Sequence, residues 1–265
     1  MAKSLRSSST IRATIPGWSE AAVVGFLIRT LACTYYGGYH IEPHAHAWGQ
    51  LVYAATGVMR VKAAGQLWLV PPARALWAPA GLEHEIRARG DFAMRTLYIS
   101  PRLAAGLPED CVGLDVPPLL RELIVHIVRL GMLNEGDPDH EALAQVAVGL
   151  LKSPRPLPSS LPWPRDPRAV AAADRMLADP SDPAELATLA RTSGASARTL
   201  QRLFLDETGF GFSEWRQRLR LLHAATLLGA GASVTEAGLE AGYASTSAFI
   251  SAFKKQLGQT PARMR

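Results

Sequence analysis

The chain has 265 residues, and 28 lysine and arginine side chains against 23 aspartate and glutamate side chains give it a formal net charge of +5. This length exceeds one average domain, so we expect two domains of unequal kind. Although 48% of the residues are apolar, no uninterrupted apolar run approaches the roughly 20 residues that span a bilayer. A membrane-spanning helix is therefore excluded and a soluble protein predicted, while the small positive charge is weak evidence for a polyanionic partner.

The N-terminus joins a basic, serine-rich start, MAKSLRSSST, to the apolar run AAVVGFLI, as a short signal peptide does. Arg29 interrupts the apolar segment and no small-residue cleavage site follows, so we expect the segment to be retained. Cys33 and Cys111 are too few for a disulfide framework and match no zinc-ribbon spacing. These features predict a cytoplasmic protein.

Short β-rich runs alternate with turn residues from about residue 26 to residue 100. GQLVYAATGVMRVKAAGQLWLV predicts three strands, with turns at Thr56-Gly57 and Ala64-Gly65. Apolar Met59 and Val61 alternate with charged Arg60 and Lys62, as expected of a half-buried sheet. Many short strands in about 75 residues indicate a small barrel or sandwich.

Two amphipathic helices are predicted after the strands. Their apolar faces are expected to comprise Leu120, Leu123, Ile124, Ile127 and Val128 in the first helix, and Leu143, Val146, Ala147 and Leu150 in the second. Such helices can cap a barrel or pair with another subunit, and we expect a homodimer.

Six prolines lie between residues 153 and 167, which is too many for a helix or a central strand. We therefore expect a linker over 153–167, between an N-terminal domain of residues 1–152 and a C-terminal domain of residues 168–265. Beyond the linker the apolar residues follow a helical period. The caps predicted there are Asp182, Ser196 and Ser213 at helix N-termini, with stops at Pro180, Gly194 and Gly209.

A helix-turn-helix pattern occurs twice in the C-terminal part. In LATLARTSGASARTLQRLF, Ala190 allows a close helix crossing and Gly194 makes the turn. In VTEAGLEAGYASTSAFISAFKK, Gly238 and Gly242 hold comparable places. Residues 241–265 also carry basic side chains and no acidic one. Two such patterns, joined by one long helix, predict a DNA-binding domain.

This arrangement, with the closing sequence GYASTSAFISAFKKQLGQTPARMR, resembles the AraC/XylS family of transcription regulators over about residues 166–265. The resemblance implies that exposed residues of the two second helices bind DNA. Arginine suits guanine and glutamine suits adenine, whereas the second of these helices departs from the more polar residues common in the family. The implied DNA-binding residues are Ser196, Arg198, Thr199, Gln201, Arg202, Ser245, Thr246, Ser247, Ile250, Ser251, Lys254, Lys255 and Thr260.

The N-terminal half carries a second motif, in HIEPHAHAWGQL and WAPAGLEHEI. His44 and His46 are one residue apart, and the spacing of a strand places both on the same face, together with Gln50. Downstream, PxGxxH ends at His84. The two motifs resemble those of cupins over roughly residues 35–100.

In metal-binding cupins the matching positions are ligands, which implies a site of His44, His46, Gln50 and His84 for Zn, Ni, Fe or Mn. Gln50 stands where a glutamate is more usual, so the site should bind a dication more weakly. The alternatives are direct contact of the histidines with an effector and a purely structural role. The residues expected to wall an effector pocket are Trp48, Tyr53, Trp68, Trp77 and Tyr98.

Together the resemblances imply an α+β protein: a cupin-like β-barrel with following helices, and an all-α domain with two helix-turn-helix motifs. They imply a regulator, not an enzyme, that binds promoter DNA and a small-molecule effector, with contact to RNA polymerase left open. The length and the LPWPRDPR segment also resemble regulators of a neighbouring transporter gene. Two alternatives remain: a metal-dependent cupin oxygenase or isomerase with a DNA-binding tail, and a regulator for which the metal is itself the signal.

Overall fold

The structure is a computed structural model that describes residues 3–5, 25–37, 39–72, 74–88, 90–152, 160–258 and 260–264. Most of the N-terminal run considered as a signal peptide lies outside the described residues. The chain forms two compact units, Met1–Ala64 with Val70–Pro158 and Gly65–Leu69 with Ser159–Arg265. Among the helices of the described ranges, none is both long enough and apolar enough to cross a membrane.

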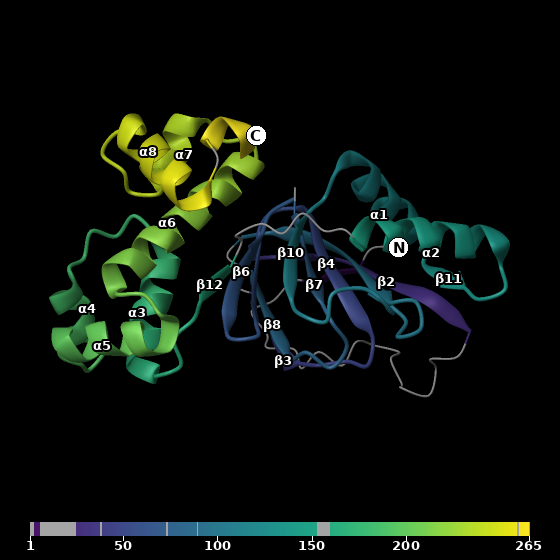
Figure 1. Cartoon of the computed structure of the whole chain (residues 1–265), viewed down its shortest axis with the longest axis horizontal. Coiled ribbons are helices and arrows are strands. Elements are labelled where there is room, and N and C mark those ends of the chain that lie inside the picture. The colour runs from purple at the N-terminus through teal and green to yellow at the C-terminus, as the bar shows by residue number, and fades with distance from the viewer. Residues whose placement is uncertain are drawn as a thin grey trace. The chain divides into compact units, whose positions relative to one another are not determined.

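The first unit is rich in β-structure (Figure 1). Its strands are β1 (Lys3–Leu5), β2 (Phe26–Tyr35), β3 (His40–His44), β4 (Gly49–Thr56), β5 (Met59–Ala63), β7 (Arg74–Ala78), β8 (His84–Ala88), β9 (Phe92–Ile99), β10 (Val112–Asp115) and β11 (Met132–Asn134). One sheet has the order β1-β2-β9-β4-β7-β10, with β11 also paired to β2. In the other sheet, β8 pairs antiparallel with both β3 and β5.

The strands lie where the period-2 pattern of the sequence predicted them. Burial alternates residue by residue along β5, with Met59 and Val61 buried and Arg60 and Lys62 half-buried. The turns at Thr56-Gly57 and Ala64-Gly65 are confirmed, and the strand β6 (Gln66–Val70) follows the second turn.

Helices α1 (Pro118–Leu130) and α2 (Pro138–Leu151) pack against the larger sheet and confirm the two predicted helices. The predicted face of α1 is correct, since its buried residues are Leu120, Ile124 and Ile127. The predicted face of α2 is partly wrong. Val146 is 49% exposed, because α2 turns Ala144, Val148 and Leu151 toward the sheet instead.

The second unit is mainly helical. Strand β12 (Ser160–Pro162) pairs antiparallel with β6. The helices are α3 (Pro167–Ala178), α4 (Leu186–Thr192), α5 (Ala197–Thr208), α6 (Phe212–Gly229), α7 (Val234–Glu240), α8 (Thr246–Leu257) and the short 3-10 helix η2 (Pro261–Met264). Part of the predicted linker thus forms a strand, and residues 153–159 of it lie outside the described residues. The α+β class is confirmed, while the domain boundaries stay a prediction.

Two helix-turn-helix pairs, α4–α5 and α7–α8, lie on either side of α6 in the second unit (Figure 1). The cap at Ser196 and the stops at Pro180 and Gly209 are confirmed. The caps predicted at Asp182 and Ser213 are wrong. Helix α4 begins after Glu185, because the Asp182 carboxylate instead accepts a hydrogen bond from the Ala184 amide in the preceding loop. Helix α6 begins after Gly211, which places Ser213 inside the helix.

Gly57 is a position where the fold requires glycine, and alanine there should destabilise the first unit. Its φ is 74°, and a Cβ would lie 2.2 Å from the Asp91 carbonyl oxygen. Gly136 has a similar φ of 79° with nothing within 4 Å of such a Cβ. Gly136→Ala should therefore lower the free energy of unfolding by about 1–2 kcal/mol, the cost of left-handed backbone for an L-residue. Gly57→Ala should cost at least about 1 kcal/mol more, because overpacking adds to this strain.

Urea unfolding followed by tryptophan fluorescence measures both variants. Equal losses of stability would contradict the close approach of the Asp91 carbonyl to Gly57.

Candidate functional site

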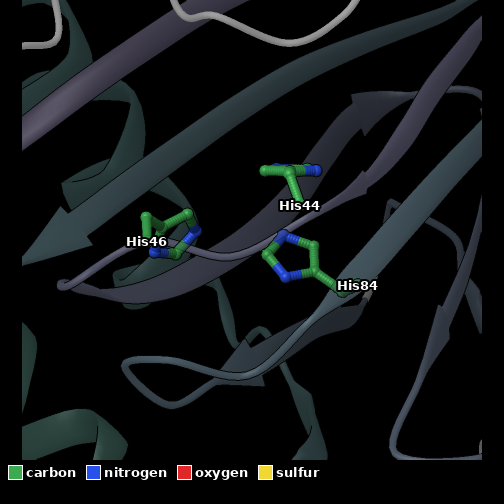
Figure 2. A group of neighbouring side chains, drawn as sticks. All are labelled: His44, His46 and His84. Carbon is green, nitrogen blue, oxygen red and sulfur yellow. The ribbon is translucent and has the colours of Figure 1, made fainter.

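Three histidines converge in the first unit (Figure 2). His44 ends β3 and His84 begins β8, and the two residues are paired across these strands. His46 lies two residues beyond the end of β3. One nitrogen from each ring lies within 4.8 Å of the nitrogens of the other two. The structure therefore brings together the three histidines that the sequence predicted as one site.

The route by which His46 reaches the site differs from the prediction. His46 lies on the connection between β3 and β4, so strand alternation does not orient it. The amide of Gly81, whose φ is 78°, donates a hydrogen bond of 2.8 Å to the His46 carbonyl. This contact joins the loop before His84 to the segment that carries His46.

Each ring of the cluster has its Nδ1 atom at a backbone carbonyl. The partners are the carbonyl oxygens of Glu42 at 2.8 Å from His44, Trp48 at 2.5 Å from His46 and Leu82 at 3.0 Å from His84. A carbonyl oxygen can only accept a hydrogen bond, so each Nδ1 carries the proton. In the neutral ring the lone pair is then on Nε2. This second contact is typical of metal-ligating histidines, in which it fixes the tautomer and the orientation of the ring.

Gln50 on β4 completes the site. Its Oε1 atom lies 3.0 Å from His46 Nε2 and 2.9 Å from His84 Nε2. On the other side, Gln50 Nε2 donates to Thr96 Oγ1 at 2.9 Å, and the Thr96 hydroxyl donates to the Leu51 carbonyl at 2.9 Å. Gln50 and Thr96 are both buried. Thr96 thus holds the amide with its oxygen toward the histidines.

The site gathers acceptor atoms with little opposing charge. Burial lowers the pKa of His84 to about 4 and also lowers the pKa of His44, so both rings are neutral near pH 7. Neutral imidazole lone pairs and an amide oxygen at these distances repel one another unless a positive charge or hydrogen-bond donors lie among them. Such a set suits a divalent cation or the donor groups of a small molecule.

Thr96 was missed by the sequence reasoning. It lies on β9, 46 residues from Gln50, and no motif marks it. Its role follows from the pairing of β4 with β9.

The five aromatic residues predicted to wall an effector pocket do not lie together. Tyr98 packs against His46, with ring centroids 5.2 Å apart. Tyr53 and Trp77 belong to the core shared with α1 and α2, because Tyr53 alternates with Gln50 along β4 and so faces the other side of the sheet. Trp48 contributes its carbonyl to His46, and Trp68 lies on β6, in the second unit.

The first predicted DNA-binding helix, α5, exposes much of its predicted surface. Arg198, Gln201 and Arg202 are exposed and Thr199 is half-buried. Ser196 caps the helix by accepting from the Thr199 amide. The end of the Gln201 side chain lies over Gly211, where a Cβ would be 2.7 Å from Gln201 Nε2. The two arginines are therefore the better placed candidates for reading bases.

The second predicted DNA-binding helix, α8, presents small and basic side chains. Ser245 caps the helix by accepting from the Ala248 amide. The exposed candidates are Ser247, Ile250, Ser251, Lys254 and Lys255, and the half-buried ones are Thr246 and Thr260. The assignment of these residues to DNA stays a prediction.

Comparisons with known proteins match two family models to this chain. Residues 31–205 match the family model of an AraC-like ligand binding domain, and residues 189–265 match that of a helix-turn-helix domain. The HTH-type transcriptional regulator NimR of Escherichia coli K12 is 35% identical over 220 residues, which cover 83% of this chain and 80% of NimR. The chain therefore belongs to the AraC family of DNA-binding transcription regulators, and the resemblance found in the sequence is confirmed.

Two further matches cover a smaller share of the chain. The regulator RipA of Corynebacterium glutamicum is 43% identical over 102 residues, or 38% of this chain and 30% of RipA. Among solved structures, the DNA-binding domain of AdpA in complex with a target DNA is 32% identical, covers 37% of this chain and 89% of that chain, and gives a TM-score of 0.35.

Arg202→Ala should weaken binding to the DNA upstream of the protein's own gene and relax base preference at one position. A bidentate arginine–guanine contact contributes about 1–3 kcal/mol of discrimination, or roughly 5- to 150-fold in relative affinity. The control is Arg129→Ala, which removes the same charge from the exposed surface of α1. Fluorescence anisotropy at fixed salt measures both. If Arg202→Ala matches Arg129→Ala in affinity and sequence preference, α5 does not read bases through Arg202.

Proposed function

We propose that the protein is a ligand-responsive transcription regulator. In this proposal the cluster of His44, His46, His84 and Gln50 binds a divalent metal ion that takes part in sensing, and occupancy changes the affinity of the helix-turn-helix unit for promoter DNA. The observation that carries the proposal is the Nδ1–carbonyl contact of all three histidines, together with the amide oxygen of Gln50 beside the Nε2 atoms of His46 and His84.

The donor set fits a metal ion. Three imidazoles and a neutral oxygen suit Zn, Ni, Fe or Mn. A bound ion would supply positive charge to the cluster and an open position for an anionic or carbonyl group of an effector. Because the amide of Gln50 leaves the dication uncompensated, binding should be weaker than with a carboxylate. Weak and reversible binding suits a sensor.

Direct recognition of an effector is the second function that the same atoms could perform. The convergent acceptors can receive hydrogen bonds from a small molecule that carries several donors, with Tyr98 beside them as an apolar wall. In this case the histidines need no metal.

The enzyme alternative has less support. Among the described residues, the side chains that gather as potential ligands are three histidines, with no carboxylate. Glu83, next to His84, is exposed. A cupin oxygenase or isomerase that used these histidines as metal ligands would need a general base from elsewhere. Consumption of oxygen by an iron-loaded protein would favour the enzyme over the regulator.

The signal can be transmitted only by a difference in affinity. A ligand shifts an equilibrium between two arrangements if it binds one of them more tightly. By linkage, DNA must then change the affinity for the ligand by the same factor. We place this regulator in the cytoplasm. Control of a neighbouring transporter gene and contact with RNA polymerase remain predictions from the sequence.

Metal binding is tested by zinc titration of chelator-stripped protein in competition with a chromophoric chelator. We expect about one zinc per chain, lost in the His44→Ala/His46→Ala variant and kept in His126→Ala, which changes an exposed histidine of α1. Gln50→Glu should bind zinc about tenfold more tightly or better, which is about 1.4 kcal/mol. Equal zinc in the wild-type protein and the double variant would overturn the metal proposal and leave direct effector contact.

We also infer that the protein is a homodimer formed through α1 and α2. Leu119 is 63% exposed, Leu130 47% and Val146 49%, and all three lie on these two helices. Large exposed apolar side chains on two helices that pack together can form an association surface. Sedimentation velocity should show a dimer that Leu119→Glu/Val146→Glu converts to a monomer. A wild-type monomer at micromolar concentration, or a dimer that survives the double substitution, would contradict this interface.

A further inference from the structure

The second unit has two separate apolar cores that share one helix. One core contains Leu189, Leu200 and Phe204 of the first helix-turn-helix with Trp215 and Leu219 of α6. The other contains Phe249 and Phe253 of the second helix-turn-helix, together with further residues of α6, Leu221, Ala225 and Leu228. Figure 1 shows α6 passing from one helix-turn-helix pair to the other. Apolar packing therefore attaches each pair to α6. It does not join the two pairs to each other, so α6 is the apolar connection that sets the angle between them.

A polar contact lies on the part of α6 where the two cores overlap. Arg220 lies between Leu219 and Leu222, which belong to the first core, and next to Leu221, which belongs to the second. Its Nε atom donates to the Pro180 carbonyl at 2.7 Å, and Nη2 donates to the carbonyls of Asp182 at 3.1 Å and Ser181 at 3.4 Å. These carbonyls belong to the loop between α3 and α4, which leads into the first helix-turn-helix.

The second helix-turn-helix meets the same loop at Gly242. This residue lies between α7 and α8, with a φ of 76°. A Cβ there would lie 3.2 Å from Ser181 Cα and 3.3 Å from Arg220 Cζ. The missing side chain thus lets the turn of the second pair lie against the loop of the first, with the guanidinium beside both.

Arg216, one helical turn before Arg220, strengthens the attachment of α6 to this loop. Its Nη1 atom donates to the Ala184 carbonyl at 2.9 Å. Arg218 has other partners, since it forms an ion pair with Glu214 on the same helix. The side chains of Arg216 and Arg220 therefore both donate to backbone carbonyls of the loop between α3 and α4.

We propose that Arg220, seated against Gly242, fixes the angle between the two helix-turn-helix pairs and so sets the spacing between the two DNA motifs that α5 and α8 recognise. Arg220 is a positioning residue that touches no DNA. When α5 and α8 are held rigidly relative to each other, binding of one helix to its DNA motif gives the other a high effective concentration at a second motif of one spacing. At other spacings the effective concentration is low. Without the contact, the angle between the two pairs is less restricted, and other spacings become acceptable.

The chemistry of the contact makes the residue specific. A planar guanidinium can donate to several carbonyls from one rigid fork, whereas the ammonium of lysine is a compact group on a flexible stem. Arg220→Lys should therefore keep the positive charge but lose the fixed angle between the two helix-turn-helix pairs.

The test is selection of bound sites from a random double-stranded DNA library, with sequencing of the motifs and of the distances between them. We expect the wild-type protein to select two motifs at one preferred spacing. Arg220→Gln and Arg220→Lys should keep both motifs, spread the spacing over several base pairs, and lose about tenfold in affinity for the wild-type spacing. Arg168→Gln, which changes an exposed arginine of α3 paired with Asp166, should leave the spacing unchanged.

Gly242→Ala provides the second variant, because it displaces the turn from the opposite side of the contact. If Arg220→Gln fails to fold by circular dichroism, the spacing selected by Gly242→Ala decides. The proposal is overturned if folded variants keep the wild-type spacing, if they lose one motif outright, or if the wild-type protein selects a single motif, since α8 would then read no bases.

Discussion

The function proposed for the first unit depends on three hydrogen bonds from imidazole Nδ1 atoms to backbone carbonyls. These bonds decide the tautomer of His44, His46 and His84, and hence which nitrogen faces the other rings. Gln50, whose Nε2 atom donates to Thr96 Oγ1, adds its Oε1 atom beside the ring of His84. Without these bonds, the three histidines would lie close together but their tautomers and ring orientations would not be fixed. With them, the unit presents a set of acceptors oriented for a cation or for the donors of an effector.

Most of the fold was predictable because local pattern and tertiary packing agree. The strands from Gly49 to Val70 follow period-2 alternation, and the two glycine-containing turns lie where expected. The helices of the second unit follow the 3.6-residue period, and Ser196 caps α5 as predicted. The two helix-turn-helix pairs were predictable for the same reason, since their small residues and turn glycines lie close together in the sequence.

The errors arise where long-range packing chooses between local options that are nearly equal. Asp182 could cap a helix, yet its carboxylate accepts from the Ala184 amide in the loop. Val146 fits an apolar stripe of α2, but α2 turns Ala144, Val148 and Leu151 toward the sheet instead. The convergence of the three histidines and Gln50 was predictable from spacing, whereas the contact of Thr96 with Gln50 was not, because the two residues are 46 positions apart. Assignment of pocket walls from composition alone likewise ignored that Tyr53 and Gln50 point to opposite faces of β4.

Apolar and polar contacts have different roles in the second unit. Two small cores stabilise two similar helix pairs on α6, and the half-buried guanidinium of Arg220 donates to the loop that leads into the first pair. A regulator of this kind needs a DNA-binding unit rigid enough to discriminate between sites and a sensing unit whose occupancy can change. If the histidine cluster binds a dication as proposed, the neutral amide at Gln50 suits the second requirement, since it would make that binding reversible.

The central claim is that occupancy of the histidine cluster and DNA binding are thermodynamically linked. The most direct measurement is the zinc affinity of the wild-type protein, determined by chelator competition with and without saturating promoter DNA at fixed salt and pH. The account predicts dissociation constants that differ by about fivefold or more, the low end of typical coupling between sites, and no difference for DNA that lacks the promoter sequence. Equal zinc affinities in the free and promoter-bound protein would contradict it.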